Sequence, residues 1–598
     1  MIQERVQALR NLMKERGIDI YLIPTADFHQ SEYVGDYFKV REYLSGFTGS
    51  FGTLAVTQET AALWTDGRYF LQAEKELRDS KISLMKMGME GVPEIEDYLV
   101  NEIPPDGCLG FDGRTVSEKA GRRLEVRLAA KNAAIFWQED LADRIWTDRP
   151  ALPRESAFLL DASYTGVTRE EKISEVREDM KLAGATAQIF AGLDEIAWLL
   201  NLRGNDIAYN PVALAYAIVT QDAFELFIQK EAVTDEVRTE LEKADVTLWP
   251  YQSIYESAAK FSPDDRILLD GDKTNYALAC SLPSSCKMIF AESPVTVRKA
   301  IKTPIEIENM KLAQIKDGAA MCKFIYWLKQ NVGKGTITEL SAAAYAEKMR
   351  KADPDYLELS FSTIAAYGEN AAMCHYHPTP QSDAKVKPEG FFLLDSGGQY
   401  WQGTTDVTRT ISVGALTNEE KINFTLVLQG HIRLAMARFL YGCCGANLDY
   451  LARGPLWERG LDYNHGTGHG VGYLLNVHEG PNNIRWRVDG GATGTARLEE
   501  GMVTSNEPGF YEEGEYGIRT ENLIVCKKAE KTKYGQFMEF ETITLVPIDR
   551  EGILPDMLEE KELQWLNDYH KKVYDLVGVH VNEEVREWLE EVTRPIRD

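Results

Sequence analysis

Residues 391–410 read FFLLDSGGQYWQGTTDVTRT, and this stretch decides how the second half of the chain folds. The apolar run at its start has the length and composition of a fully buried strand, and it ends at Asp395. An unpaired carboxylate there is costly, so Asp395 requires a cation or hydrogen-bond donors nearby. Asp406 follows eleven positions later, beyond two glycines and among threonines, where we expect the partner strand of a hairpin.

Three more candidate ligands follow along the chain: His469 within HGTGHG, Glu507 within NEPG and Glu521 within RTEN. Taken singly, each would be an ordinary surface, cap or core residue. Together, four carboxylates and one imidazole in strand-like or glycine-rich stretches provide the ligands that two hard divalent cations need. Because the set is rich in carboxylates and contains a single His, it favours Mn(II) over a structural zinc site, with Co, Zn and Fe left open.

The glycines of residues 465–472 are interpreted as places where the backbone approaches a ligand closely. Two cations that share bridging oxygens can polarise a scissile carbonyl and supply a nucleophile at neutral pH, which predicts a two-metal peptidase. Cys374 lies beside His375 and leaves a thiol nucleophile as an alternative, although a small buried filler is the simpler interpretation.

The N-terminal part of the chain alternates helix-like and strand-like segments, which predicts α/β structure. A helical face over residues 3–16 precedes strand-like segments at 18–24, 52–56 and 61–65. A similar order recurs within residues 186–228. We therefore predict two related α/β domains, residues 1–155 and 156–302.

A third domain is predicted over residues 303–598. The start of its first helix is indicated by Thr303, Pro304 and Glu306, because Thr-x-x-Glu is a capping box and proline suits the first helical position. Apolar residues at three- and four-residue spacing then continue to Leu328 as a buried face. The remainder to about residue 547 is strand-rich, and residues from about 550 to 598 are expected to form a helical extension packed on the outside.

The bulk composition excludes several classes of function. The chain has 598 residues and a formal net charge of −27, which argues against nucleic acid as a partner. The negative charge favours cationic ligands, such as the amino terminus of a peptide. The alternative interpretation is that the charge only keeps the protein soluble. Eight cysteines without a CxxC pair, no secretory segment and no membrane-spanning run predict a reduced, cytoplasmic protein.

Six motifs together resemble a known family: LDSG (394–397), TDVTRT (405–410), GTGHGVG (466–472), NVHEGP (476–481), EPG (507–509) and IRTEN (518–522). They are similar to the motifs of the pita-bread metallopeptidases, and most similar to the three-domain cytosolic Xaa-Pro aminopeptidases (aminopeptidase P). The resemblance begins in the N-terminal part, through WTDGRYFLQA (64–73), and runs to about residue 547. It implies two creatinase-like N-terminal α/β domains followed by a pita-bread catalytic domain, and a homodimer.

The resemblance also implies roles for particular residues. Asp395 and Asp406 would chelate one metal, Asp406 and Glu521 would bridge to the second, and His469 and Glu507 would complete its shell. Glu507 would also be the general base, and His478 would bind the scissile carbonyl and its oxyanion. The substrate-side residues would be His375, His465, Tyr511, Arg519 and, from the first domain, Arg68. For Arg68 the competing interpretation is a solvated arginine in a surface turn, and His377 receives no role.

The implied reaction is removal of the first residue from peptides with proline in second position, by attack of a metal-bridging hydroxide on the Xaa-Pro bond. That bond has no N–H, so a site that recognises the backbone N–H fails with proline. The alternatives are a prolidase, which cleaves only X-Pro dipeptides, and a peptide-binding module that has lost catalysis. Two N-terminal domains favour the aminopeptidase over the prolidase. A complete ligand set disfavours the non-catalytic module and the creatinase-like hydrolases, which lack these ligands.

Overall fold

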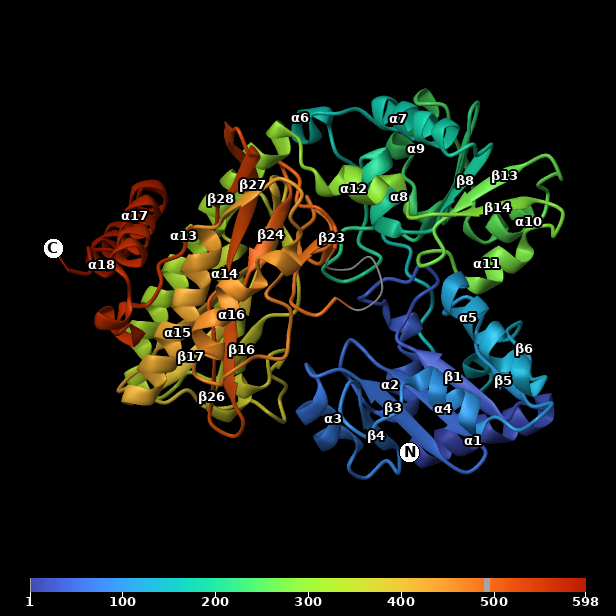
Figure 1. Cartoon of the computed structure of the whole chain (residues 1–598), viewed down its shortest axis with the longest axis horizontal. Coiled ribbons are helices and arrows are strands. Elements are labelled where there is room, and N and C mark those ends of the chain that lie inside the picture. The colour runs from blue at the N-terminus through green and yellow to red at the C-terminus, as the bar shows by residue number, and fades with distance from the viewer. Residues whose placement is uncertain (1, 489–494, 598) are drawn as a thin grey trace. The chain divides into compact units, whose positions relative to one another are not determined.

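The computed structural model describes residues 2–488 and 495–597. The chain forms two compact units, one of Met1–Ala162 with Val167–Val295 and the other of Ser163–Gly166 with Thr296–Asp598. The first unit contains two mixed sheets, and the second contains the strands and long helices of the predicted third domain (Figure 1). This division does not test the predicted boundaries at residues 155 and 302, which stay predictions.

The first sheet has the strand order β4-β3-β2-β1-β5-β6. Antiparallel pairs join β1 to β2 and β2 to β3, and parallel pairs complete both edges. The predicted segments at 18–24, 52–56 and 61–65 correspond to strands β1–β3, and the predicted first helix is α1 (Ile2–Arg16). The strands are β1 (Ile20–Pro24), β2 (Thr53–Thr57), β3 (Ala61–Thr65), β4 (Ser83–Lys86), β5 (Cys108–Gly110) and β6 (Ala134–Phe136).

The second sheet repeats this topology with the order β12-β11-β10-β8-β13-β14. Each pair has the same sense as its counterpart in the first sheet, with two antiparallel pairs in the centre and parallel pairs outside. An internal duplication accounts for this agreement, as the sequence predicted. The strands are β8 (Ala187–Phe190), β10 (Ala215–Thr220), β11 (Phe224–Ile228), β12 (Val246–Pro250), β13 (Arg266–Leu269) and β14 (Lys287–Phe290).

Two equivalent loops hold these sheets together. One follows β5 and leads to the Ser117 cap of α5 (Glu118–Leu128), and the other follows β13 and leads to the Asn275 cap of α11 (Tyr276–Ser281). They exchange backbone hydrogen bonds, from Glu118 N to Thr274 O and from Tyr276 N to Val116 O, each 2.8 Å long. The duplicated domains therefore pack through corresponding elements.

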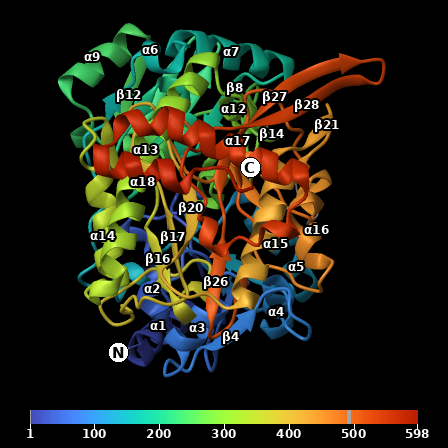
Figure 2. The ribbon, with the colours of Figure 1, turned by 90° about the vertical axis from the view of Figure 1, so that its left-hand side faces the viewer.

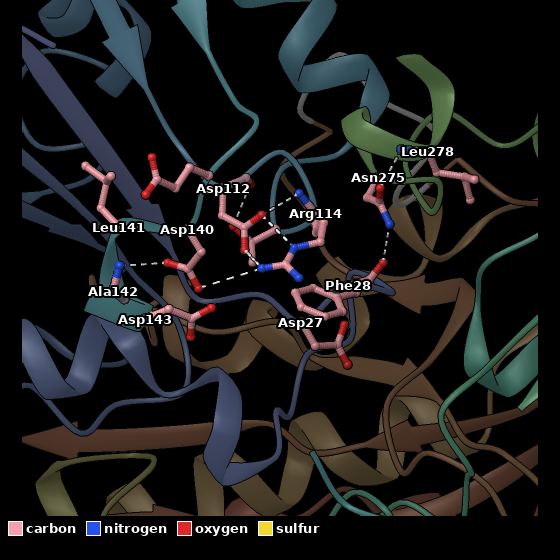
Figure 3. A network of polar contacts seen from close by, with 12 residues as sticks. Asp27, Phe28, Asp112, Arg114, Asp140, Leu141, Ala142, Asp143, Asn275 and Leu278 are labelled. Atoms are coloured by element: carbon pink, nitrogen blue, oxygen red, sulfur yellow. Dashed lines mark hydrogen bonds and ion pairs between the residues drawn. The ribbon is translucent and has the colours of Figure 1, made fainter. Parts of the chain in front are cut away.

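Side chains reinforce this junction (Figure 3). Arg114 donates from Nε and Nη2 to the Asp112 carboxylate over 3.0 Å, and its Nη2 lies 3.9 Å from Asp140. Asn275 Nδ2 donates to Phe28 O over 2.8 Å, while Asn275 Oδ1 accepts from Leu278 N and caps α11. The Arg114 contacts stay within the first domain, so of these bonds only the one from Asn275 to Phe28 O joins the two domains, and a satisfied buried amide of this kind fixes their packing.

The second unit begins with α13 (Pro304–Asn331), whose start was predicted correctly. Thr303 Oγ1 accepts from Glu306 N over 3.1 Å, and Glu306 Oε2 accepts from Thr303 N over 2.8 Å, which is the predicted capping box. Met310, Cys322 and Leu328 on the predicted apolar face are completely buried. Helix α14 (Glu339–Arg350) packs on α13.

Strands of the second unit form separate small sheets and one larger sheet. β16 (Ile364–Tyr367), β17 (Phe391–Ser396) and β20 (Val407–Ser412) make an antiparallel sheet, with β17 in the centre. The larger sheet has the order β21-β28-β27-β24-β22-β23. Its strands are β21 (Arg438–Leu440), β22 (Gly468–Gly470), β23 (Glu479–Ile484), β24 (Val503–Asn506), β27 (Asn522–Thr532) and β28 (Gly535–Thr542). The other strands are β15 (Tyr356–Leu359), β18 (Gly398–Tyr400), β19 (Gly403–Thr404), β25 (Gly509–Glu512) and β26 (Tyr516–Arg519).

Helices flank these strands in the second unit. Figure 2 shows α13 and α14 on one side of β16, β17 and β20, with α15 (Asn418–Ala435) and α16 (Asp449–Trp457) on the other. The predicted C-terminal extension forms α17 (Glu560–Val577) and α18 (Glu583–Val592), and α17 packs against α13 and α15. Among the described residues, the chain has no helix with the length and apolar character needed to cross a membrane.

Candidate active site

The five predicted metal-ligating residues converge where the sheet of β17 and β20 meets the larger sheet. Asp395 lies on β17 opposite Thr408 of β20, and Asp406 directly precedes β20. The partner strand predicted for Asp406 therefore starts one residue after it. Glu521 directly precedes β27, and its backbone N donates to Thr408 O over 3.2 Å. This hydrogen bond joins the two sheets at the site.

His469 of β22 presents one ring nitrogen to the carboxylates. Its Nδ1 lies 2.9 Å from Gly470 O and donates to that carbonyl, so Nε2 is the unprotonated ring nitrogen. Nε2 lies 3.5 Å from Asp406 Oδ2 and 3.5 Å from Glu507 Oε1. Asp406, His469 and Glu521 each offer a ligand atom within 4.8 Å of the others. The tautomer and the spacing both suit cation binding.

Burial, together with electrostatic repulsion among the carboxylates, explains their raised pKa values. Burial raises the pKa of Asp406 well above its usual value, and the neighbouring charges of Asp395 and Glu507 raise it further. The pKa of Glu521 is raised in the same way, by burial and then by Asp406. Burial, with Asp395 contributing, raises the pKa of Glu507 to about 7. So many buried acids destabilise one another unless protons or cations neutralise them.

The residues present fit divalent cations. Asp395 Oδ1 is buried and has no hydrogen-bond partner among the described residues, whereas Asp395 Oδ2 pairs with Arg519 Nη2 at 2.5 Å. An orphaned buried carboxylate oxygen is costly, and a cation is its natural partner beside three other acids. Oxygen ligands with one imidazole also match the preference of Mn(II) and similar cations.

A polar chain connects this cluster to the predicted substrate pocket. Arg519 donates from Nη1 to Tyr511 Oη over 2.6 Å, and Tyr511 Oη lies 2.8 Å from His465 Nε2. Because His465 Nδ1 donates to Gly466 O over 2.7 Å, its Nε2 accepts the tyrosine proton. These contacts link four side chains in the order Asp395, Arg519, Tyr511, His465. The acidic cluster is thus connected to the aromatic side chains of the predicted substrate pocket.

Two other predicted residues lie around this group. The His478 ring meets the His469 ring edge to face, with centroids 4.3 Å apart. His375 is half-buried in the loop after the short helix Gly368–Ala372, and the adjacent Cys374 is close enough to influence the Tyr511 hydroxyl. His377, which received no role, lies within electrostatic reach of Asp395. The 375–377 loop therefore borders the same site.

Arg68 belongs to the first compact unit, so it lies outside the group that the second unit brings together. It donates from Nε and Nη2 to the Asp66 carboxylate, with Nη2–Oδ2 at 2.8 Å, and lies 3.8 Å from Glu32. This pairing differs from the solvated side chain of the competing interpretation. A role at the substrate stays a prediction.

Sequence reasoning missed several residues that hold the site in shape. Thr408 Oγ1 donates to Glu521 Oε2 over 2.7 Å, and Ser505 Oγ lies 3.2 Å from Glu507 Oε1. Thr408 lies inside the TDVTRT motif and Ser505 lies two residues before Glu507, so hydroxyls close to acids in sequence were a usable signal. Arg453 donates to Asp449, Tyr463 O and His465 O and so fixes the glycine-rich loop. In sequence, Asp449 and Arg453 look like an ordinary exposed pair one helical turn apart.

The interpretation of the glycine-rich stretch needs a correction. A Cβ on Gly468 would lie 2.0 Å from Ser505 O, and one on Gly470 would lie 2.2 Å from Glu479 O. Backbone of the neighbouring strands β24 and β23 therefore excludes side chains there, and an approach to a ligand is not needed to explain these glycines. Gly466 has no neighbour closer than 3.6 Å.

Comparison with protein families gives matches along nearly the whole chain. Residues 5–137 and residues 148–306 each match a creatinase/prolidase N-terminal domain. Residues 308–528 match metallopeptidase family M24, and residues 536–596 match the C-terminal region of M24 peptidases. These matches confirm the predicted fold class, with two related N-terminal domains before a pita-bread domain.

Individual relatives agree with this assignment over most of their own length. A probable Xaa-Pro aminopeptidase P of Talaromyces marneffei is 40% identical over 99% of this chain and 92% of its own length. Aminopeptidase P2 of Arabidopsis thaliana is 39% identical over 100% of this chain and 89% of its own. The structure of an X-prolyl aminopeptidase from Caenorhabditis elegans, described as a cytosolic enzyme with a di-nuclear active site, matches with a TM-score of 0.95 and 37% identity over 100% of both chains. The chain belongs to metallopeptidase family M24.

Proposed function

We propose that this enzyme removes the N-terminal residue from peptides with proline in second position, using two divalent cations held by Asp395, Asp406, His469, Glu507 and Glu521. The observation that carries the proposal is the cluster of Asp406, His469 and Glu521 ligand atoms within 4.8 Å of one another, with Glu507 3.5 Å from His469, in a chain that matches Xaa-Pro aminopeptidases P along 99% of its length. The rival prolidase reading has less support, because these relatives share both N-terminal domains as well as the catalytic domain.

The cations are proposed to be Mn(II), with Co, Zn and Fe as alternatives. When bound, two such cations supply Lewis-acid polarisation of the scissile carbonyl and a water made acidic enough to attack at neutral pH. Asp406 and Glu521 would bridge them, Asp395 would complete one shell, and His469 and Glu507 the other. Asp395 Oδ1, which has no hydrogen-bond partner among the described residues, and His469 Nε2, 3.5 Å from both Asp406 and Glu507, support this ligand set.

The remaining residues carry the proposed proton transfers and contacts with substrate. Glu507, whose Oε1 lies 3.5 Å from His469 Nε2, would be the general base that accepts a proton at its carboxylate. His478 would donate a hydrogen bond to the scissile carbonyl oxygen as negative charge develops there. Tyr511 and His465 would contact the proline ring, since an aromatic wall needs no N–H from its ligand. His375 and Arg68 are proposed to contact substrate.

Hydrolysis of two peptides by the Mn(II)-loaded enzyme tests this proposal. Arg-Pro-Pro should release free arginine and Pro-Pro, and Gly-Pro should be a poor substrate. Cleavage of Gly-Pro alone would identify a prolidase instead. If both peptides stay intact with every candidate cation, the chain is a peptide-binding module that has lost catalysis.

A homodimer is proposed as the working assembly. Three aromatic side chains, Tyr450, Trp457 and Trp486, are 58%, 37% and 43% exposed and form one cluster, with ring centroids 6.0 and 5.8 Å apart. Grouped exposed aromatic rings are typical of an interaction surface, and a second copy of this chain is the proposed occupant. We further propose a cytoplasmic location, which the eight free cysteines support.

A further inference from the structure

Two buried asparagines lie beside two of the proposed metal ligands. Asn506 directly precedes Glu507, and Asn522 directly follows Glu521. The two asparagines face each other in the ladder between β24 and β27, and both are completely buried. A shift of either asparagine therefore moves the adjoining carboxylate.

His431 of α15 ties these strands together. Its Nε2 accepts from Asn522 Nδ2 over 3.0 Å, so its Nδ1 is the donor to Asn506 O over 3.1 Å. Asn506 Nδ2 donates in turn to His431 O over 2.9 Å. Burial lowers the pKa of His431 to about 3, which keeps the ring neutral with one donor and one acceptor.

Arg409 of β20 extends the network to the C-terminal region. It donates from Nη1 to Glu521 O over 2.6 Å and from Nη2 to Asn522 Oδ1 over 2.7 Å. The same Nη2 donates to Tyr569 Oη of α17 over 2.9 Å, and Tyr569 Oη donates to Val546 O over 2.8 Å. Helix α17 thus reaches the backbone of a proposed ligand through a single arginine.

Aromatic packing holds the same helix against the network. Trp565, one turn before Tyr569, stacks on the Tyr569 ring with centroids 5.2 Å apart and planes 4° apart. The Trp565 ring also meets His431 edge to face, with centroids 6.0 Å apart. Arg433 Nε donates to Glu562 Oε1 over 2.7 Å and fastens α15 to α17.

We propose that Tyr569 and His431 are positioning residues for the cation site, acting through Arg409, Asn522 and Asn506 on Glu521 and Glu507. The proposal rests on the ligand set given above. The proposal assigns a role to helix α17. This helix lies after residue 528, where the similarity to the family M24 domain ends, and within residues 536–596, which are similar to the C-terminal region of M24 peptidases. Hydrogen-bond partners behind metal ligands fix their orientation, and losing one typically weakens metal binding about 10–100-fold.

The substitution Tyr569→Phe tests this inference, because it removes the hydroxyl and keeps the ring on Trp565. Tyr400→Phe is the matched control. Tyr400 is also buried, and its Oη donates to Asp317 Oδ1 over 2.9 Å, outside the network around Asn522. Tyr400→Phe loses this one buried hydrogen bond and should lose about 1–3 kcal/mol of stability in thermal or urea unfolding, whereas Tyr569→Phe loses at least the bonds with Arg409 and Val546 and should lose more.

Calorimetric titration of the metal-free proteins with Mn²⁺ then separates the two variants. We expect Tyr569→Phe to raise the Kd for Mn²⁺ about 10-fold or more, and Tyr400→Phe to leave it within about 2-fold of wild type. A second pair of variants guards against a folding defect. His431→Leu should weaken Mn²⁺ binding, and His431→Gln, which keeps one donor and one acceptor, should recover part of the loss.

Unchanged Mn²⁺ affinity in both Tyr569→Phe and His431→Leu would overturn the inference. If Tyr400→Phe weakened Mn²⁺ binding as much as Tyr569→Phe does, the inference would also be overturned, because the loss of affinity would then come from a general loosening of the fold. If the folded wild-type protein takes up none of Mn²⁺, Co²⁺, Zn²⁺ and Fe²⁺, the ligand set itself fails and this inference fails with it. Uptake by wild type distinguishes the two failures.

Discussion

At the scale of single residues, the site is a balance between repelling acids and the few groups that oppose them. Arg519 offsets part of the charge at Asp395, and Thr408 donates to Glu521, yet Asp395 Oδ1 keeps no partner among the described residues. The raised pKa values of Asp406, Glu507 and Glu521 are the physical sign of that imbalance. Divalent cations would relieve it.

The acidity of Glu507 predicts a pH dependence of stability in the metal-free protein. Its pKa is raised from 4.5 to about 7, so the folded state holds a proton that the unfolded state releases over that range. This contribution to stability is fully present below about pH 4.5 and is lost as the pH rises through 7. Glu507→Gln should therefore flatten the fall in unfolding free energy between pH 4.5 and 7, by at most about 1.4 kcal/mol per pH unit.

Urea unfolding in the presence of a chelator, at several pH values, measures this slope. His431 and His570, each with a pKa lowered to about 3 by burial, give an opposite slope below pH 6.5 that is common to both proteins. The difference between wild type and variant removes this common slope and reports Glu507 together with its effect on the pKa of Asp406 and Glu521. If the unfolding free energies of wild type and Glu507→Gln change with pH at the same rate, the raised pKa of Glu507 is contradicted.

His478 is predicted to act on the substrate and not on the cations. His478→Ala should retain the full metal content and lower kcat about 100-fold or more, the scale of a lost oxyanion donor. The exposed His580 gives a control, since His580→Ala should change neither quantity. Metal analysis and steady-state kinetics on Arg-Pro-Pro check both variants. Full turnover by His478→Ala would refute its assignment.

At the scale of elements, patterns local in sequence predicted structure well. The buried strand at 391–396 and the capped helix from Pro304 agree with the structure because each depends on neighbouring residues only. The reason for the glycines at 468 and 470 was wrong, because it depends on strands that are distant in sequence. Periodicity indicates which face is buried and does not indicate which backbone will lie against it.

That correction predicts the effect of adding a single methyl group. Gly468→Ala places Cβ 2.0 Å from Ser505 O, so β22 must separate from β24. We expect a loss of at least about 2–3 kcal/mol in unfolding free energy. Gly466→Ala, whose Cβ meets nothing closer than 3.6 Å, should stay within about 1 kcal/mol of wild type. Equal stability of the two variants in urea unfolding would contradict the observed strand packing.

At the scale of the whole molecule, the duplicated sheets could be predicted because the order of segments repeats along the chain. The five proposed ligands were also predictable, since each lies in a distinctive motif. The supporting network could not be predicted in this way. His431, Arg453 and Tyr569 lie in ordinary helical sequence, and apart from Asp449, four positions from Arg453, the hydrogen-bond partners named for them are between 10 and 160 positions away. Such contacts are fixed by the tertiary packing of helices on sheets.

The proposed homodimer gives a prediction at the same scale. In light scattering after size-exclusion chromatography, the protein should have twice the mass of one chain. Trp457→Ser combined with Trp486→Ser should weaken association about 10-fold or more, because aromatic anchors dominate interfaces. Tyr534→Ser, at an isolated exposed ring, should have no effect. A mass that does not respond to the tryptophan substitutions would exclude this surface as the interface.

The most direct test of the central claim is anomalous X-ray scattering from crystals of the Mn(II)-loaded enzyme. The account predicts two neighbouring manganese peaks, contacted by Asp395, Asp406, His469, Glu507 and Glu521, and the loss of both in Asp406→Ala. Peaks elsewhere in the molecule, or none among these five side chains in fully loaded protein, would contradict it.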